Sequence, residues 1–146
     1  MIEIVVVLAL LSILIAVTVP GMGGVKEKWL LEKAAWGLAA DMRLARQVAI
    51  TTGKYTRMEF RWKAREYQMR LPVEKTVVKL PEGIVYARNN FPGSEEVRKL
   101  SFSSLGAPSQ GGTVGFKTGS GLKRYVILTP ATGRVRVSPE PPEGDY

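Results

Sequence analysis

The sequence predicts an α+β fold, in which one long N-terminal helix packs on antiparallel β-sheet. Three observations support this prediction. An apolar run opens the chain, a helical stripe of apolar residues follows it, and after Gly53 apolar and polar residues alternate with a period of two. We therefore expect three parts: an apolar helix with a Pro/Gly break at 1–24, an amphipathic helix at 25–53, and a β-rich head at 54–146.

The apolar run is "MIEIVVVLALLSILIAVTVP", and Glu3 is its only charged residue. The stretch from Ile4 to Val19 lies at the short edge of the length that crosses a bilayer. No basic residue precedes it, so it differs from a secretory signal peptide and fits a single helical anchor. A carboxylate inside a membrane helix costs about 3 kcal/mol unless it has a partner. Glu3 therefore either lies solvated among headgroups or pairs with a positive charge of another copy, whose N-terminal amine is the candidate.

The end of this run carries helix-weakening residues. Pro20 removes a backbone donor, and Gly21, Gly23 and Gly24 lower the local helix propensity. The segment is either a simple linker or a place where the helix loses hydrogen bonds and lengthens.

The amphipathic helix has one narrow apolar stripe and ends before Gly53, which suits the left-handed position after a helix. The many alanines predict close packing against a sheet. Trp29 and Trp36 lie seven residues apart on one face, either in the core or at contacts with other subunits. The stripe consists of Leu31, Ala35, Leu38, Met42, Ala45 and Ala49.

The period of two predicts a hairpin with its turn at Ala64 and Arg65, followed by six more short strands. We expect the aromatic residues of the first hairpin to belong to the sheet core rather than to a surface that stacks nucleic-acid bases. These aromatic residues are Tyr55, Phe60, Trp62 and Tyr67. The predicted strands are 56–62, 67–71, 76–80, 84–87, 99–102, 113–117, 125–129 and 134–137.

Composition argues against enzymatic activity. The chain has no His and no Cys, so it lacks the commonest general base, the commonest metal ligand and thiolate sites. We predict no catalytic residues, no metal and no cofactor. The net charge of +8 indicates either an anionic partner or simply a soluble surface.

The last predicted strand pair contains the most conspicuous basic motif, "TPATGRVRV". Pro130 suits the opening of a hairpin turn and Gly133 suits a positive φ. Alternation then directs Arg134 and Arg136 outward whatever their role. The motif thus has a purely structural explanation. In the alternative explanation the motif binds DNA, and Lys123 and Arg124 on the preceding strand extend its basic surface.

The apolar run, with one early Glu and a Pro seventeen residues later, resembles the N-terminal helix of type IV pilins and type II secretion pseudopilins. The stretch "KAAWGLAADMRLARQVAITTGK", followed by "LPEGIVYA", "LSFSSLGAPSQGGTVGF" and "GRVRV", is similar to the GspH/FimT subgroup. Glu3 and Pro20 stand two places earlier than in that family, so either the start is trimmed or misassigned by two residues, which we favour, or the chain departs from the family pattern.

This resemblance implies a subunit that waits in the inner membrane, with a methylated N-terminus, and is then added to a helical filament of identical or similar pilins at the cell surface. Its partners would include the assembly platform and ATPase of a pilus or secretion system. Glu3 would set the register of packing, and Pro20 to Gly24 would soften the helix. In the alternative, a minor pilin or pseudopilin of a type II secretion or DNA-uptake machine binds DNA through the Gly-Arg-x-Arg hairpin, contacting phosphates without sequence preference.

Overall fold

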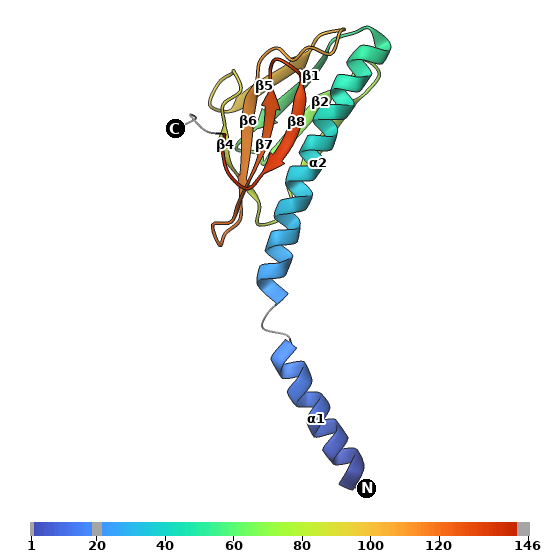
Figure 1. Ribbon diagram of the computed structural model, residues 1–146, viewed down its shortest axis with the longest axis vertical. Helices are drawn as coiled ribbons and strands as arrows, with labels where there is room; N and C mark the ends of the chain where they lie inside the picture. The colour runs from blue at the N-terminus through green and yellow to red at the C-terminus, as the bar shows by residue number, and fades with distance from the viewer. Residues whose placement is uncertain (1, 19–21, 143–146) are drawn as a thin grey trace.

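The computed structural model describes residues 2–18 and 22–142 (Figure 1). Two helices, α1 (Ile2–Thr18) and α2 (Met22–Thr52), precede eight strands, which confirms the predicted α+β class. The head packs beside the C-terminal part of α2, and α1 extends away from it at the opposite end of the molecule. The strands are β1 (Thr56–Arg61), β2 (Glu66–Arg70), β3 (Lys75–Lys79), β4 (Val85–Asn89), β5 (Val97–Phe102), β6 (Gly112–Lys117), β7 (Lys123–Thr129) and β8 (Arg134–Ser138).

The strands form two antiparallel sheets of four strands each, in the orders β3-β2-β1-β5 and β4-β6-β7-β8. Each strand begins and ends within two residues of its predicted position. Two sequence-local hairpins fall where they were expected. Phe60 pairs with Tyr67 across the β1–β2 turn, and Thr129 pairs with Arg134 across the β7–β8 turn. Gly133 has the predicted positive φ, of 63°, and its N–H donates to the carbonyl of Thr129 at 2.9 Å.

The second helix differs from the prediction at its start. It begins at Met22, three residues before the expected Val25, so Gly23 and Gly24 belong to its first turn. Glycine lowers helix propensity by only about 1 kcal/mol per residue, a cost that thirty-one residues of continuous helix can absorb. The helix ends as predicted, because Gly53 adopts a φ of 64° directly after Thr52.

The core lies between the apolar stripe of α2 and the inner faces of both sheets. All six predicted stripe residues are buried, each with at most 1% of its surface exposed. They meet Met58 and Phe60 of β1 and Val126 and Leu128 of β7 in one hydrophobic cluster. The alanines permit this approach, because a larger side chain at those positions would hold the helix away from the strands.

Two of the four aromatic residues assigned to the core are not fully buried. Phe60 and Tyr67 are in the core, but Tyr55 is 67% exposed and Trp62 is 39% exposed. Tyr55 precedes β1, outside the regular alternation. Trp62 follows β1 and stacks on Tyr86 of β4, with ring centroids 5.5 Å apart.

Polar contacts fasten α2 to the sheets around this core. Arg43 donates to the carbonyl of Val135 at 2.9 Å, and Arg46 donates to the carbonyl of Gly106 at 3.0 Å. Glu32 accepts from Arg124 of β7 at 2.7 Å. These α2 residues outside the apolar stripe thus bind the helix to β7 and β8 of the second sheet and to the loop between β5 and β6.

Candidate functional site

The surface of α1 is the most unusual part of the molecule, because nothing in the described chain covers it. Its large apolar side chains are each at least 49% exposed. The helix is apolar on every side, so it has no polar face to turn toward water. We call this set the α1 surface: Ile2, Ile4, Val5, Val6, Val7, Leu8, Leu10, Leu11, Ile13, Leu14 and Ile15.

Glu3 lies in the first turn of α1 and is exposed among these apolar side chains. A carboxylate in the first turn interacts favourably with the helix dipole. Among the described residues, no helix has the length and apolar character needed to cross a membrane.

The predicted soft segment is only partly described. Pro20 and Gly21 lie outside the described residues. Gly23 and Gly24 are helical, and a Cβ added at either would meet no atom within 4 Å. Close packing within this chain therefore does not require glycine at these two positions.

Trp29 and Trp36 are on the outer side of α2, away from the core, with 59% and 53% of their surfaces exposed. The ammonium of Lys33 lies 5.2 Å from the centroid of the Trp29 ring. The sequence left open whether these residues belong to the core or to subunit contacts, and the first possibility is now excluded.

The hairpin arginines are arranged as the alternation predicted. Arg134 and Arg136 are exposed on β8, while Val135 between them is buried. Among the described residues, neither arginine forms an ion pair with a carboxylate. Both guanidinium groups thus lie where an anionic ligand can reach them.

Arg124 does not share this basic surface, and that expectation is wrong. Successive residues of a strand point to opposite faces of a sheet. Arg124 points toward α2, where it pairs with Glu32, whereas Arg136 is on the outer face of β8 beside Ile127. Lys123 lies at the far end of β7 from Thr129, which pairs with Arg134. Of the four predicted DNA-binding residues, only Arg134 and Arg136 therefore lie side by side on one surface, while Lys123 and Arg124 lie elsewhere.

The described residues contain no group of three His, Cys, Asp or Glu side chains that could hold a metal ion. The buried polar contacts instead support the fold. The hydroxyl of Tyr67 donates to Asp41 on α2 at 2.5 Å, and the hydroxyl of Tyr86 donates to the carbonyl of Glu66 at 2.9 Å. Burial raises the pKa of both phenols above the ordinary value, and the Asp41 carboxylate raises that of Tyr67 further.

No sequence-family model matches the chain, and no curated protein is significantly similar to it in sequence. Solved structures do resemble it. The minor pseudopilin EpsH from the type 2 secretion system of Vibrio cholerae matches 74% of this chain and 95% of its own, with a TM-score of 0.59 and 15% identity. The type IV minor pilin FimU of Pseudomonas aeruginosa matches 82% of this chain and 98% of its own, with a TM-score of 0.62 and 17% identity.

The chain has the pilin fold. A second crystal form of FimU leads to the same conclusion, with a TM-score of 0.58 over 80% of this chain. The resemblance predicted from the apolar run and from the stretch "KAAWGLAADMRLARQVAITTGK" is thus confirmed at the level of the fold. Within this pilin fold, the sheets cover α2 and leave α1 bare, so the α1 surface is the main candidate for contacts with other molecules.

Proposed function

We propose that the chain is a structural subunit of an extracellular, type IV pilus-like filament. The observation that carries this proposal is the α1 surface, whose eleven large apolar side chains are all exposed. Burying each such side chain is worth about 1.5–3 kcal/mol relative to water. Helices of other copies provide a cover of the same chemistry, with the β-rich heads on the outside. The pilin fold supports this arrangement.

Before assembly, the same helix rests in the inner membrane, and the assembly platform and ATPase of a pilus or secretion system add the subunit to the filament. Lipid tails already satisfy the apolar side chains, so the transfer from membrane to filament gains little from hydrophobicity. The packing of the helices in the filament is then selected by the shape of their surfaces and by the charge of Glu3. A carboxylate surrounded by apolar helices is strongly favoured where it meets a positive charge of a neighbouring copy.

Filament preparations imaged by electron microscopy test this role of Glu3. Glu3→Gln keeps the shape of the side chain and removes its charge, so we expect few or no filaments from it. Ser12→Ala is the matched control, since Ser12 is exposed on the same helix and its hydroxyl donates to the carbonyl of Leu8 within that helix. Normal filaments from Glu3→Gln would refute the register role.

A second candidate is a minor subunit of a type II secretion or DNA-uptake machine that binds DNA through the hairpin. Two features support it: the exposed Arg134 and Arg136, and the likeness to one minor pseudopilin and one minor pilin. A gel shift with duplex DNA at low salt tests it. Arg134→Ala/Arg136→Ala should lose DNA, while Lys79→Ala/Lys99→Ala, which removes the same charge elsewhere, should retain it. Unchanged DNA binding by the arginine variant would exclude the hairpin as the DNA-binding site.

A further inference from the structure

A basic groove lies where α2 ends and the first sheet begins, far from the α1 surface. It has a volume of about 720 Å³. Three segments line it: residues 53–57, which lead from α2 into β1, residues 70–72 at the end of β2, and the loop after β5. Its polar lining consists of Lys54, Tyr55, Arg57, Arg70, Ser103 and Ser104, and no carboxylate lines it. We call it the basic groove.

Cations continue from the groove across the outer face of the sheet. Arg57 of β1 is directly opposite Arg70 of β2, and Arg70 is directly opposite Lys75 of β3. Adjacent strands lie about 5 Å apart, so these three cations form one row. Like charges opposite each other destabilise a sheet, so this row gains stability when an anion binds along it.

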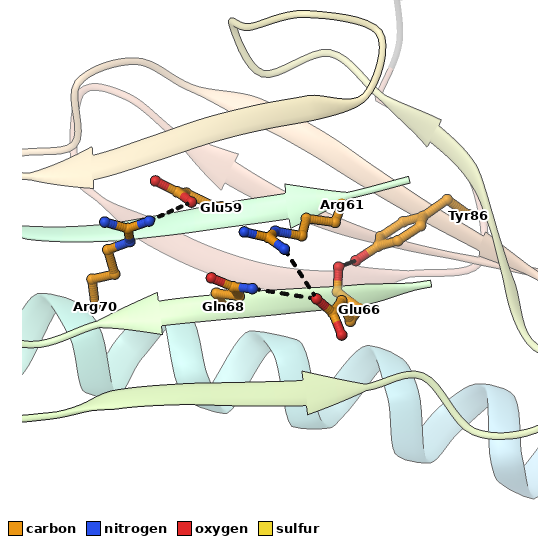
Figure 2. Close-up of polar contacts among 6 residues, drawn as sticks. All are labelled: Glu59, Arg61, Glu66, Gln68, Arg70 and Tyr86. Atoms are coloured by element: carbon orange, nitrogen blue, oxygen red, sulfur yellow. Dashed lines mark hydrogen bonds and ion pairs between the residues drawn. The ribbon is translucent and has the colours of Figure 1, made fainter. Parts of the chain in front are cut away.

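The two other rows of the same face contain carboxylates, as Figure 2 shows. Glu59 is buried and pairs with Arg70 at 3.2 Å, while Glu66 pairs with Arg61 at 3.7 Å. The row at the groove contains no carboxylate of its own, and its one ion pair is the contact of Arg70 with Glu59 of the next row. In the described part of the chain, neither Lys54 nor Arg57 has a carboxylate partner. The uncompensated positive charge of this face is therefore concentrated at the groove.

An aromatic ring stands beside these cations. Tyr55 is 67% exposed, and the guanidinium of Arg57 lies 6.0 Å from its ring centroid. Exposed aromatic rings in a basic groove are the feature by which proteins hold unpaired bases, since every base has a face that stacks. Ser103 and Ser104 add hydroxyl donors for oxyanions.

We propose that the basic groove binds a single strand of nucleic acid. Lys54, Arg57 and Arg70 contact successive phosphates, and Lys75 extends the path. A row of cations suits a polymer with repeated charges better than one isolated phosphate. Tyr55 distinguishes nucleic acid from other polyanions, because acidic polypeptides and uronate polymers bring no base to stack. The inference is independent of filament assembly and of the hairpin arginines.

Fluorescence anisotropy with a labelled oligothymidylate and the full chain in nonionic detergent tests this proposal. Lys54→Gln/Arg57→Gln should weaken binding at least about tenfold at low salt. It should also reduce the slope of log affinity against log salt by about 1.4, the amount for two phosphate contacts to a single strand. Tyr55→Ala should weaken binding about tenfold, whereas Tyr55→Phe, which keeps the ring, should bind as the unmodified chain does.

The matched control is Lys79→Gln/Lys99→Gln, which removes two exposed cations from the other rows of the same face. It should bind within about twofold of the unmodified chain. Equal losses of affinity in both double variants would overturn the proposal, because they would indicate non-specific electrostatic attraction to the whole basic surface. Displacement of the oligonucleotide by polyglutamate or a uronate polymer at equal charge concentration would also overturn it. A duplex that binds as tightly as the single strand would rule out the stacking role of Tyr55.

Discussion

At the scale of single residues, the contact between Tyr67 and Asp41 is the clearest determinant of stability. Tyr67 is 2% exposed, and its hydroxyl donates to a carboxylate that is itself partly buried. Tyr67→Phe keeps the ring and leaves Asp41 without this donor. We expect the free energy of unfolding to fall by about 1–3 kcal/mol. Urea denaturation followed by near-ultraviolet circular dichroism measures the change.

The Asp41→Asn variant serves as the control for that measurement. The amide that replaces the carboxylate retains an acceptor for the Tyr67 hydroxyl but carries no charge. The free energy of unfolding should therefore fall less for Asp41→Asn than for Tyr67→Phe. An unchanged free energy of unfolding in Tyr67→Phe would mean that water replaces the hydroxyl at no cost.

The same phenol predicts how stability depends on alkaline pH. Burial and the neighbouring carboxylate raise the pKa of Tyr67 in the folded chain above its unfolded value of about 10. The folded state therefore holds this proton more tightly. The contribution of this phenol to the free energy of unfolding is fully present below about pH 10 and decreases as the pH rises further. Chemical denaturation at a series of alkaline pH values should show a steeper loss for the unmodified chain than for Tyr67→Phe. Parallel curves would contradict the assignment.

At the scale of elements, the stripe of α2 determines how the helix is seated on the sheets. Leu38 is fully buried, whereas Leu44 on the same helix is 47% exposed. Leu38→Ala should lower the free energy of unfolding by about 2–5 kcal/mol, because it leaves a cavity. Leu44→Ala should change it by about 0.5 kcal/mol or less. Urea midpoints of the two variants test the difference, and similar midpoints would contradict the predicted seating of α2.

Elements that depend on local sequence were predictable, and their long-range arrangement was not. Leu38 and Gly53 follow from helical spacing and C-terminal capping, and Gly133 follows from the chemistry of a hairpin turn. The division into two sheets depends on pairs such as Met58 with Leu100, which no nearby turn dictates. Sequence periodicity gives no partner for such a strand.

The candidate sites divide in the same way. Glu3 stands out in the sequence because it is the only charge in an apolar run, and Arg134 stands out because it belongs to the short Gly-Arg-x-Arg motif. The basic groove does not, since Lys54, Arg57 and Arg70 come from separate segments that meet only after β1 and β2 pair. The outward alternation of Arg57 and Arg70 in the predicted hairpin was the one available signal for it.

At the scale of the whole molecule, the apolar exposure of α1 continues onto α2 through Trp29 and Trp36. Soluble monomers rarely expose apolar surface of this extent, so we expect the two indoles to contact neighbouring subunits. Neither indole contributes to the core of its own chain. Their removal should therefore affect assembly and leave the fold intact.

Trp29→Ala/Trp36→Ala tests this expectation with two measurements on the same preparation. The free energy of unfolding should change by less than about 1 kcal/mol, because both side chains are more than half exposed. Filament yield by electron microscopy should fall sharply. Leu44→Ala removes an exposed apolar side chain elsewhere on α2 and should assemble normally. Normal filament yield from the tryptophan variant would exclude both indoles from the subunit interface, while a large loss of stability would show that they support the head instead.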